Sequence, residues 1–85
     1  MARWIITEDK INNGADVGKK STFGEPKKSE AVKFRMKDDD GEVYYHGLCD
    51  DSETEDAFEP LDDFGMPNAG CTSIEYFENG KWSVL

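Results

Sequence analysis

Residues 31–49, AVKFRMKDDDGEVYYHGLC, contain the hairpin pattern that decides the fold. Apolar Val32, Phe34 and Met36 alternate with basic residues, which is the period-two pattern of a strand with one buried face. The following aspartates and Gly41 favour a turn, and residues 42–49 are rich in aromatic and β-branched side chains. We therefore predict two antiparallel strands joined by a tight turn.

The register of this hairpin stays open between two alternatives. A two-residue loop places Met36 opposite Tyr45, whereas a three-residue loop with a glycine bulge places Met36 opposite Tyr44. Because successive side chains point to opposite faces, the choice decides which tyrosine is buried.

A second hairpin is predicted at the C-terminal end, where Asn79-Gly80 separates two β-rich runs, residues 73–78 and 81–85. A two-residue loop pairs Phe77 with Trp82 and Ile74 with Leu85. Residues 3–7 add an N-terminal strand. We expect a mainly β protein, with five strands in a strongly bent antiparallel sheet or a small, partly open barrel.

The segments between the strands are less regular. Residues 8–30 are poor in apolar side chains, and we expect a long loop with a turn near Ile11 and Val17 that reaches the core. Ser52 and Glu55 form a capping-box pattern, which predicts a short helical turn over residues 53–58 that ends before Pro60. Residues 61–70 are expected to form a structured loop. Three of its apolar side chains, together with Phe58 just before it, are expected to cover one end of the sheet: Leu61, Phe64 and Met66.

The length of 85 residues fits one small domain over residues 1–85. The N-terminal apolar run is too short for a signal peptide or a membrane helix, so we expect a cytoplasmic location and no membrane contact. In that compartment Cys49 and Cys71 would be reduced thiols.

Charge is distributed unevenly along the chain. The formal net charge is −9, with +4 in residues 1–37 and −13 in residues 38–85. Twelve Asp and Glu residues fall between positions 38 and 63, and no Lys or Arg does. Such a surface attracts basic proteins and repels nucleic acid.

The predicted function is therefore a non-catalytic acidic protein-binding module. Its concrete form is an inhibitor of phage or mobile-element type that mimics nucleic-acid charge and blocks a nuclease or another basic DNA-binding protein. The alternative is a structural or adaptor domain that acts as a homodimer through an exposed strand edge, with acidity serving solubility only. The predicted partner-binding residues are Asp38, Asp39, Asp40, Glu42, Asp50, Asp51, Glu53, Glu55 and Asp56, with Phe58 or Phe64, if exposed, as the apolar anchor.

Other chemistries receive less support from the sequence. Neither acidic run has the glycine and glutamate spacing of an EF-hand. His46, Cys49 and Cys71 supply three zinc ligands where a structural site needs four, and one histidine without a phosphate loop or serine elbow does not indicate an enzyme. We predict no cofactor, metal or catalytic residue. Lys33, Arg35 and Lys37 beside a tyrosine resemble a stacking strand face, but the net charge opposes direct nucleic-acid binding.

Overall fold

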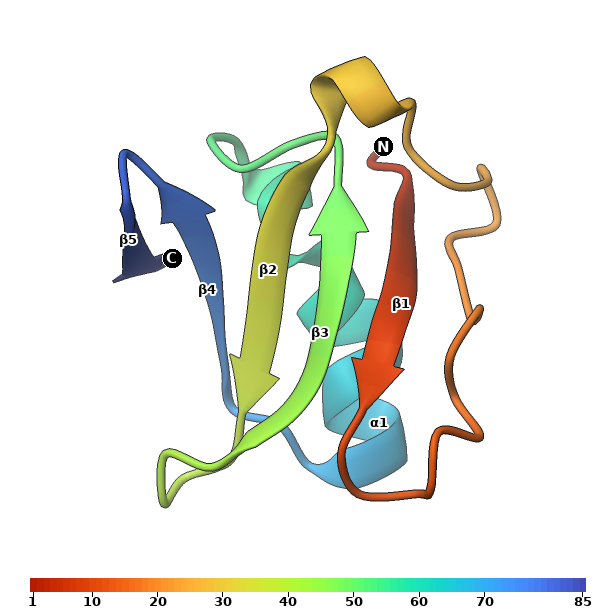
Figure 1. Ribbon diagram of the computed structural model, residues 1–85, viewed down its shortest axis with the longest axis vertical. Helices are drawn as coiled ribbons and strands as arrows, with labels where there is room; N and C mark the ends of the chain where they lie inside the picture. Colours follow the sequence, from red (N-terminus) through yellow and green to blue (C-terminus); the bar gives the residue numbers. More distant parts are fainter.

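The protein is mainly β and consists of one open five-stranded antiparallel sheet backed by a bent helical segment (Figure 1). The computed structural model describes residues 1–85. The strand order is β1-β3-β2-β4-β5, so both predicted hairpins and the N-terminal strand join a single sheet as expected. The strands are β1 Trp4–Asp9, β2 Val32–Lys37, β3 Val43–Cys49, β4 Ser73–Glu78 and β5 Lys81–Val84.

The register of the β2–β3 hairpin combines the two predicted alternatives. Near the turn, Lys37 pairs with Val43, as in the longer loop with Gly41 at positive φ. A bulge at Tyr44 then shifts the pairing, so that Met36 lies opposite Tyr45. Tyr45 is consequently buried, and Tyr44 remains partly exposed.

The C-terminal hairpin has the predicted pairing. Phe77 lies opposite Trp82 across the Asn79-Gly80 turn, and both turn residues adopt positive φ. The Leu85 N–H donates a hydrogen bond to the Ile74 carbonyl at 3.0 Å.

A helical layer covers one face of the sheet and corrects the expected loop over residues 61–70. It runs through η2 (Glu55–Phe58), η3 (Leu61–Gly65) and α1 (Met66–Ala69). Pro60 does not end it, because proline is tolerated in the first turn of a helical segment, where its missing N–H breaks no bond. Five buried residues recur at the three- and four-residue spacing of one helical face: Ala57, Pro60, Leu61, Phe64 and Gly65.

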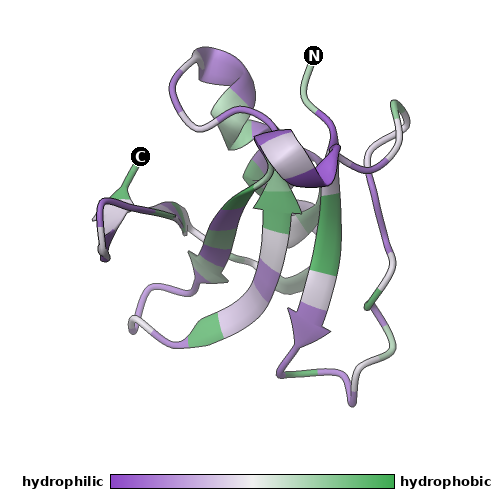
Figure 2. Cartoon of the chain, turned by 45° about the horizontal axis from the view of Figure 1, so that its top comes forward, coloured by the Kyte–Doolittle hydropathy of each residue, from purple (hydrophilic) through white to green (hydrophobic).

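The core lies between this helical layer and the sheet. Alternate strand residues point toward the helices, which gives the strands hydrophobic and hydrophilic bands (Figure 2). The Phe64 ring meets the Tyr45 ring edge-on, with centroids 5.1 Å apart. The sheet contributes several fully or almost fully buried side chains: Ile6, Phe34, Met36, Tyr45, Ile74 and Tyr76.

The segment between β1 and β2 corrects a second expectation. Ile11 and Val17 are about half exposed and do not reach the core. Residues 18–21 instead follow the outer edge of β1 (Figure 1). The Ile6 N–H donates to the Lys19 carbonyl at 2.8 Å, and the Ser21 N–H donates to the Trp4 carbonyl at 2.9 Å.

Asp9 and Tyr45 hold the preceding turn. The Asp9 carboxylate accepts hydrogen bonds from the backbone N–H groups of Ile11, Asn12 and Asp16, and the Tyr45 hydroxyl donates to Asp16 at 2.8 Å. The segment after β1 is thus fixed by hydrogen bonds although its apolar side chains face solvent. None of the helices has the length and apolar character needed to cross a membrane.

Candidate functional site

The fold divides the acidic stretch between opposite ends of the sheet. Residues 38–42 form the turn between β2 and β3, and residues 50–56 follow the other end of β3 (Figure 1). β3 has seven residues, which at strand rise separates the two groups by about 20 Å. The carboxylates therefore form two clusters, and one ligand of small size cannot contact both.

In the turn cluster, Asp38 shapes the backbone while its neighbours face solvent. Its carboxylate accepts hydrogen bonds from the N–H groups of Asp40 and Glu42, both at 2.9 Å. The bond from the Glu42 N–H is the largest cause that lowers the pKa of Asp38. The side chains of Asp39, Asp40 and Glu42 are exposed to solvent.

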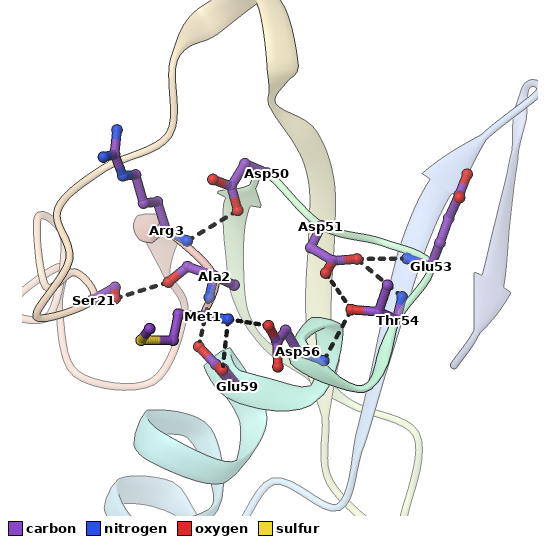
Figure 3. Close-up of polar contacts among 10 residues, drawn as sticks. All are labelled: Met1, Ala2, Arg3, Ser21, Asp50, Asp51, Glu53, Thr54, Asp56 and Glu59. Carbon is purple, nitrogen blue, oxygen red and sulfur yellow. Dashed lines mark hydrogen bonds and ion pairs between the residues drawn. The ribbon is translucent and has the colours of Figure 1, made fainter.

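At the other end of the sheet, acidic side chains hold the start of the chain (Figure 3). The Met1 ammonium pairs with Asp56 and lies 3.9 Å from Glu59. The Ala2 N–H donates to Glu59 at 2.8 Å, and the Arg3 N–H donates to Asp50 at 3.0 Å. Asp50, Asp56 and Glu59 thus have a structural role that sequence reasoning missed, because their partners lie about fifty residues away.

Asp51 organises the approach to the helical layer and replaces the predicted capping box. Its carboxylate accepts hydrogen bonds from the N–H groups of Glu53 and Thr54 and from the Thr54 hydroxyl (Figure 3). Burial opposes ionisation of Asp51, but these hydrogen bonds outweigh it and lower its pKa. Thr54, and not Ser52, then caps η2 by accepting a hydrogen bond from the Asp56 N–H.

The outer face of the helical layer combines acid with exposed apolar side chains. Glu55, Phe58, Asp62, Asp63 and Met66 are all exposed, and their spacing places them on the side away from the core. We call these five residues the helical acidic surface. Phe58 is 37% exposed and Met66 is 49% exposed.

The two predicted aromatic anchors differ in how deeply they are buried. Phe64 is only 7% exposed and packs against Trp4 and Tyr45, so it is a core residue and cannot serve as a surface anchor. Phe58 meets the condition of exposure. Sequence reasoning missed Asp62, Asp63 and Met66 as members of the surface, since it placed them in a loop.

Few of the acidic side chains have a cationic partner. Only four of the nineteen Asp and Glu residues form ion pairs: Glu8, Glu75, Asp56 and Glu59. The three carboxylates of the helical acidic surface and the three exposed carboxylates of the turn all lack such a partner. Their charge is therefore available to an external basic group.

The opposite face of the sheet carries the basic residues of β2, which are largely engaged within the sheet. Glu75 accepts a hydrogen bond from Arg35 Nε at 2.7 Å and pairs with Lys37 Nζ at 3.1 Å. The Arg35 guanidinium also stacks on Trp82, with its central carbon 4.3 Å from the ring centre. Lys33 remains the exposed cation of this strand.

A pocket of about 350 Å³ lies on this second face, beside His46. Burial is the largest cause that lowers the pKa of His46, and Lys10 and Arg35 add to this effect against the opposing Glu8. Its imidazole is therefore neutral at neutral pH. The lining residues are Thr7, Glu8, Lys33, Phe34, His46, Gly47 and Leu48.

The thiols lie away from this pocket. Cys49 and Cys71 are free and fully buried in the core, and β3 turns His46 to the opposite face from Cys49. His46 and Cys49 therefore do not come together as a pair of zinc ligands. No group of three or more His, Cys, Asp or Glu side chains is arranged to hold a metal ion.

Comparison with protein-family models, with curated proteins and with solved structures finds no match to this chain.

Proposed function

We propose that this domain is a non-catalytic binding module whose helical acidic surface engages a basic surface on a protein partner. The observation that carries the proposal is the combination of unpaired carboxylates with two exposed apolar side chains on one helical face. Complementary charge raises the rate at which two proteins associate, whereas most of the binding free energy comes from a few apolar contacts.

Phe58 is the residue that would supply most of the apolar contact. It lies between Glu55 and Asp62 on the helical spacing, and it is the only exposed phenylalanine of the helical layer. A central aromatic side chain inside a polar rim is the usual arrangement of a protein-binding hot spot. Met66, about two turns further along, extends the apolar contact with an adaptable side chain.

The partner class that fits best is a protein that binds nucleic acids. Such proteins hold phosphates with clusters of Lys and Arg, which a folded surface rich in Asp and Glu can occupy. In this proposal the domain inhibits its partner by competing with nucleic acid for the basic cluster. Asp39, Asp40 and Glu42 form a second contact at the far end of the sheet only if the partner spans the distance between the clusters.

Affinity capture with matched baits tests this proposal. One bait carries Asp62→Asn and Asp63→Asn in the helical acidic surface, and the control bait carries Asp39→Asn and Asp40→Asn in the turn. Both baits lose two negative charges, so a general effect of net charge would weaken both equally. We expect the first to lose a nucleic-acid-binding partner from a cell lysate and the second to retain it, with Phe58→Ala reducing capture as well.

Salt and DNA supply the second readout. A partner held by mimicry dissociates at high salt and is displaced by duplex DNA, because both compete for the same cations. Capture that survives high salt, ignores duplex DNA and is unaffected by Asp62→Asn with Asp63→Asn would overturn the proposal. Thermal unfolding of each bait establishes that the fold is intact.

A further inference from the structure

The sheet has one unoccupied edge, and it is β5. The outer edge of β1 already bonds to residues 18–21, whereas β5 makes backbone hydrogen bonds to β4 alone (Figure 1). An unpaired strand edge presents backbone N–H and C=O groups that can accept another strand.

The pairing of β4 with β5 determines which groups point outward. The Leu85 N–H bonds to the Ile74 carbonyl, so these two residues form a hydrogen-bonded pair. Hydrogen-bonded and non-hydrogen-bonded pairs alternate along an antiparallel ladder. Val84, opposite Glu75, and Trp82, opposite Phe77, are therefore non-bonded toward β4 and direct their N–H and C=O groups to the free side.

We propose that β5 pairs antiparallel with β5 of a second copy of the chain, about a twofold axis at Ser83. In this register the N–H groups of Trp82 and Val84 donate to the carbonyls of Val84 and Trp82 of the second copy. The symmetric relation supplies the same bonds in reverse, so that both outward-facing residues of each strand are satisfied. The two sheets then form one continuous ten-stranded sheet.

The side chains of β5 also fit a second copy. Val84 is 68% exposed, and it shares the outer sheet face with Trp82 and the exposed Phe77. The proposed register places Val84 of each copy directly opposite Trp82 of the other, a favourable cross-strand pair of an aromatic and a β-branched residue. The exposed valine thereby gains an apolar neighbour.

Charge favours this strand over the rest of the surface. β5 contains Lys81 and no acidic residue, in a chain with a net charge of −9. Two copies can therefore meet here with little local repulsion, although the long-range field of each opposes approach. The helical acidic surface lies on the other face of the sheet, so that the dimer leaves it available to a partner.

Sedimentation over a concentration series, with two variants at one position, tests the proposal. Val84→Pro removes only an outward-facing N–H, because the Val84 N–H makes no bond to β4. Two donors are lost per dimer, so we expect the dissociation constant to rise by at least about tenfold. Val84→Thr keeps both the N–H and the β-branched shape, and it should dimerise like the unchanged chain.

A second measurement avoids any change of sequence. Hydrogen exchange of the Trp82 and Val84 amides should slow as the protein concentration rises, while exchange of the Ile11 amide should not change. Added salt should strengthen the dimer by screening repulsion between like-charged copies, the opposite of its effect on a basic partner. A chain that stays monomeric, or Trp82 and Val84 amides whose exchange is independent of concentration, would overturn the proposal.

Discussion

Arg35 stacks on Trp82 although the two residues lie on strands that are not neighbours. The guanidinium carbon of Arg35 on β2 is 4.3 Å from the centre of the Trp82 ring on β5, with β4 between them. Two strand spacings amount to about 9.5 Å. The Arg35 side chain therefore reaches across β4 to the Trp82 ring, and Trp82 also contacts His46 on β3.

Glu75 on β4 holds the Arg35 side chain in this position by a hydrogen bond to Arg35 Nε. Burial raises the pKa of Glu75, but hydrogen bonds from Arg35 and Lys37 outweigh this effect, so that its pKa is lowered. The stabilisation is therefore present above the ordinary glutamate pKa and is lost as the pH falls through the lower folded value. Glu75→Gln should cost no more than about 1 kcal/mol at neutral pH.

The pH dependence provides the sharper measurement for Glu75→Gln. Thermal unfolding followed from neutral to acidic pH should show a shallower loss of stability in the variant, because the titrating group is absent. Glu78→Gln, on the same strand and without an ion pair, serves as the control and should keep the slope of the unchanged chain. Equal slopes for Glu75→Gln and the unchanged chain would contradict the assigned role.

Gly65 allows the helical layer to approach the sheet closely. A Cβ atom at this position would lie 2.6 Å from Met36 Sδ and 3.3 Å from Cys71 Cβ. Gly65→Ala should therefore destabilise the protein by about 1–3 kcal/mol, as expected for overpacking of a tight core. Because Met36 is unbranched and can move, adding Met36→Val should recover part of the loss in denaturant unfolding.

Gly47 differs from Gly65 because an added Cβ atom there would meet the backbone as well as a side chain. Its Cβ would lie 2.4 Å from the Ile5 carbonyl oxygen as well as against the Phe34 ring, and a backbone atom cannot move aside cheaply. We expect Gly47→Ala to destabilise more than Gly65→Ala. The opposite order of the two free energies would show that the helical layer, and not the sheet, is the more rigid element.

The Met1 ammonium should make the stability depend on alkaline pH. Its hydrogen bond to Asp56 raises its pKa, so the stabilisation is complete below the ordinary α-amino pKa and is lost as the pH rises through the higher folded value. Acetylation of this amine, or Asp56→Asn, should lower the melting temperature at neutral pH. Both changes should also flatten the melting temperature between about pH 7 and pH 10.

The two thiols should resist modification in the folded protein. Burial raises the pKa of Cys71 to about 11 and also raises the pKa of Cys49, and the thiolate is the reactive form. A thiol-specific reagent at pH 8 should label neither residue at an appreciable rate, and both at once after denaturant is added. Rapid labelling of the native chain would show that the helical layer opens easily over Cys71.

The hairpins were predictable because local sequence determines them. The Asn79-Gly80 turn fixes the pairing of Phe77 with Trp82 over a few residues, and the alternation around Phe34 sets the buried face of β2. The bulge at Tyr44 was not predictable, since it lets the turn keep its own geometry while Tyr45 enters the core. The bulge thus allows the longer turn and the burial of Tyr45 to occur together, whereas the sequence alone presents them as alternatives.

The helical turn predicted over residues 53–58 is confirmed by η2, but its continuation past Pro60 was missed because two signals conflict. Ala57, Leu61 and Phe64 have helical spacing, but Pro60 and Gly65 indicate an irregular segment when they are read locally. The helical segment packs closely against Met36 of the sheet, which favours the helix. The closeness of this contact explains why position 65 is a glycine. In the candidate site, exposure of Phe58 and burial of Phe64 followed from this same packing.

The strap of residues 18–21 along β1 limits how large any assembly of this sheet can become. A sheet with two open edges can polymerise without end, each copy adding to the next as in a fibril. Here one edge is closed by the chain itself, so that growth through β5 terminates at two molecules. Loss of the strap would free an edge built from Trp4, Ile5 and Ile6, and an ordinary small domain would then become a subunit capable of forming filaments.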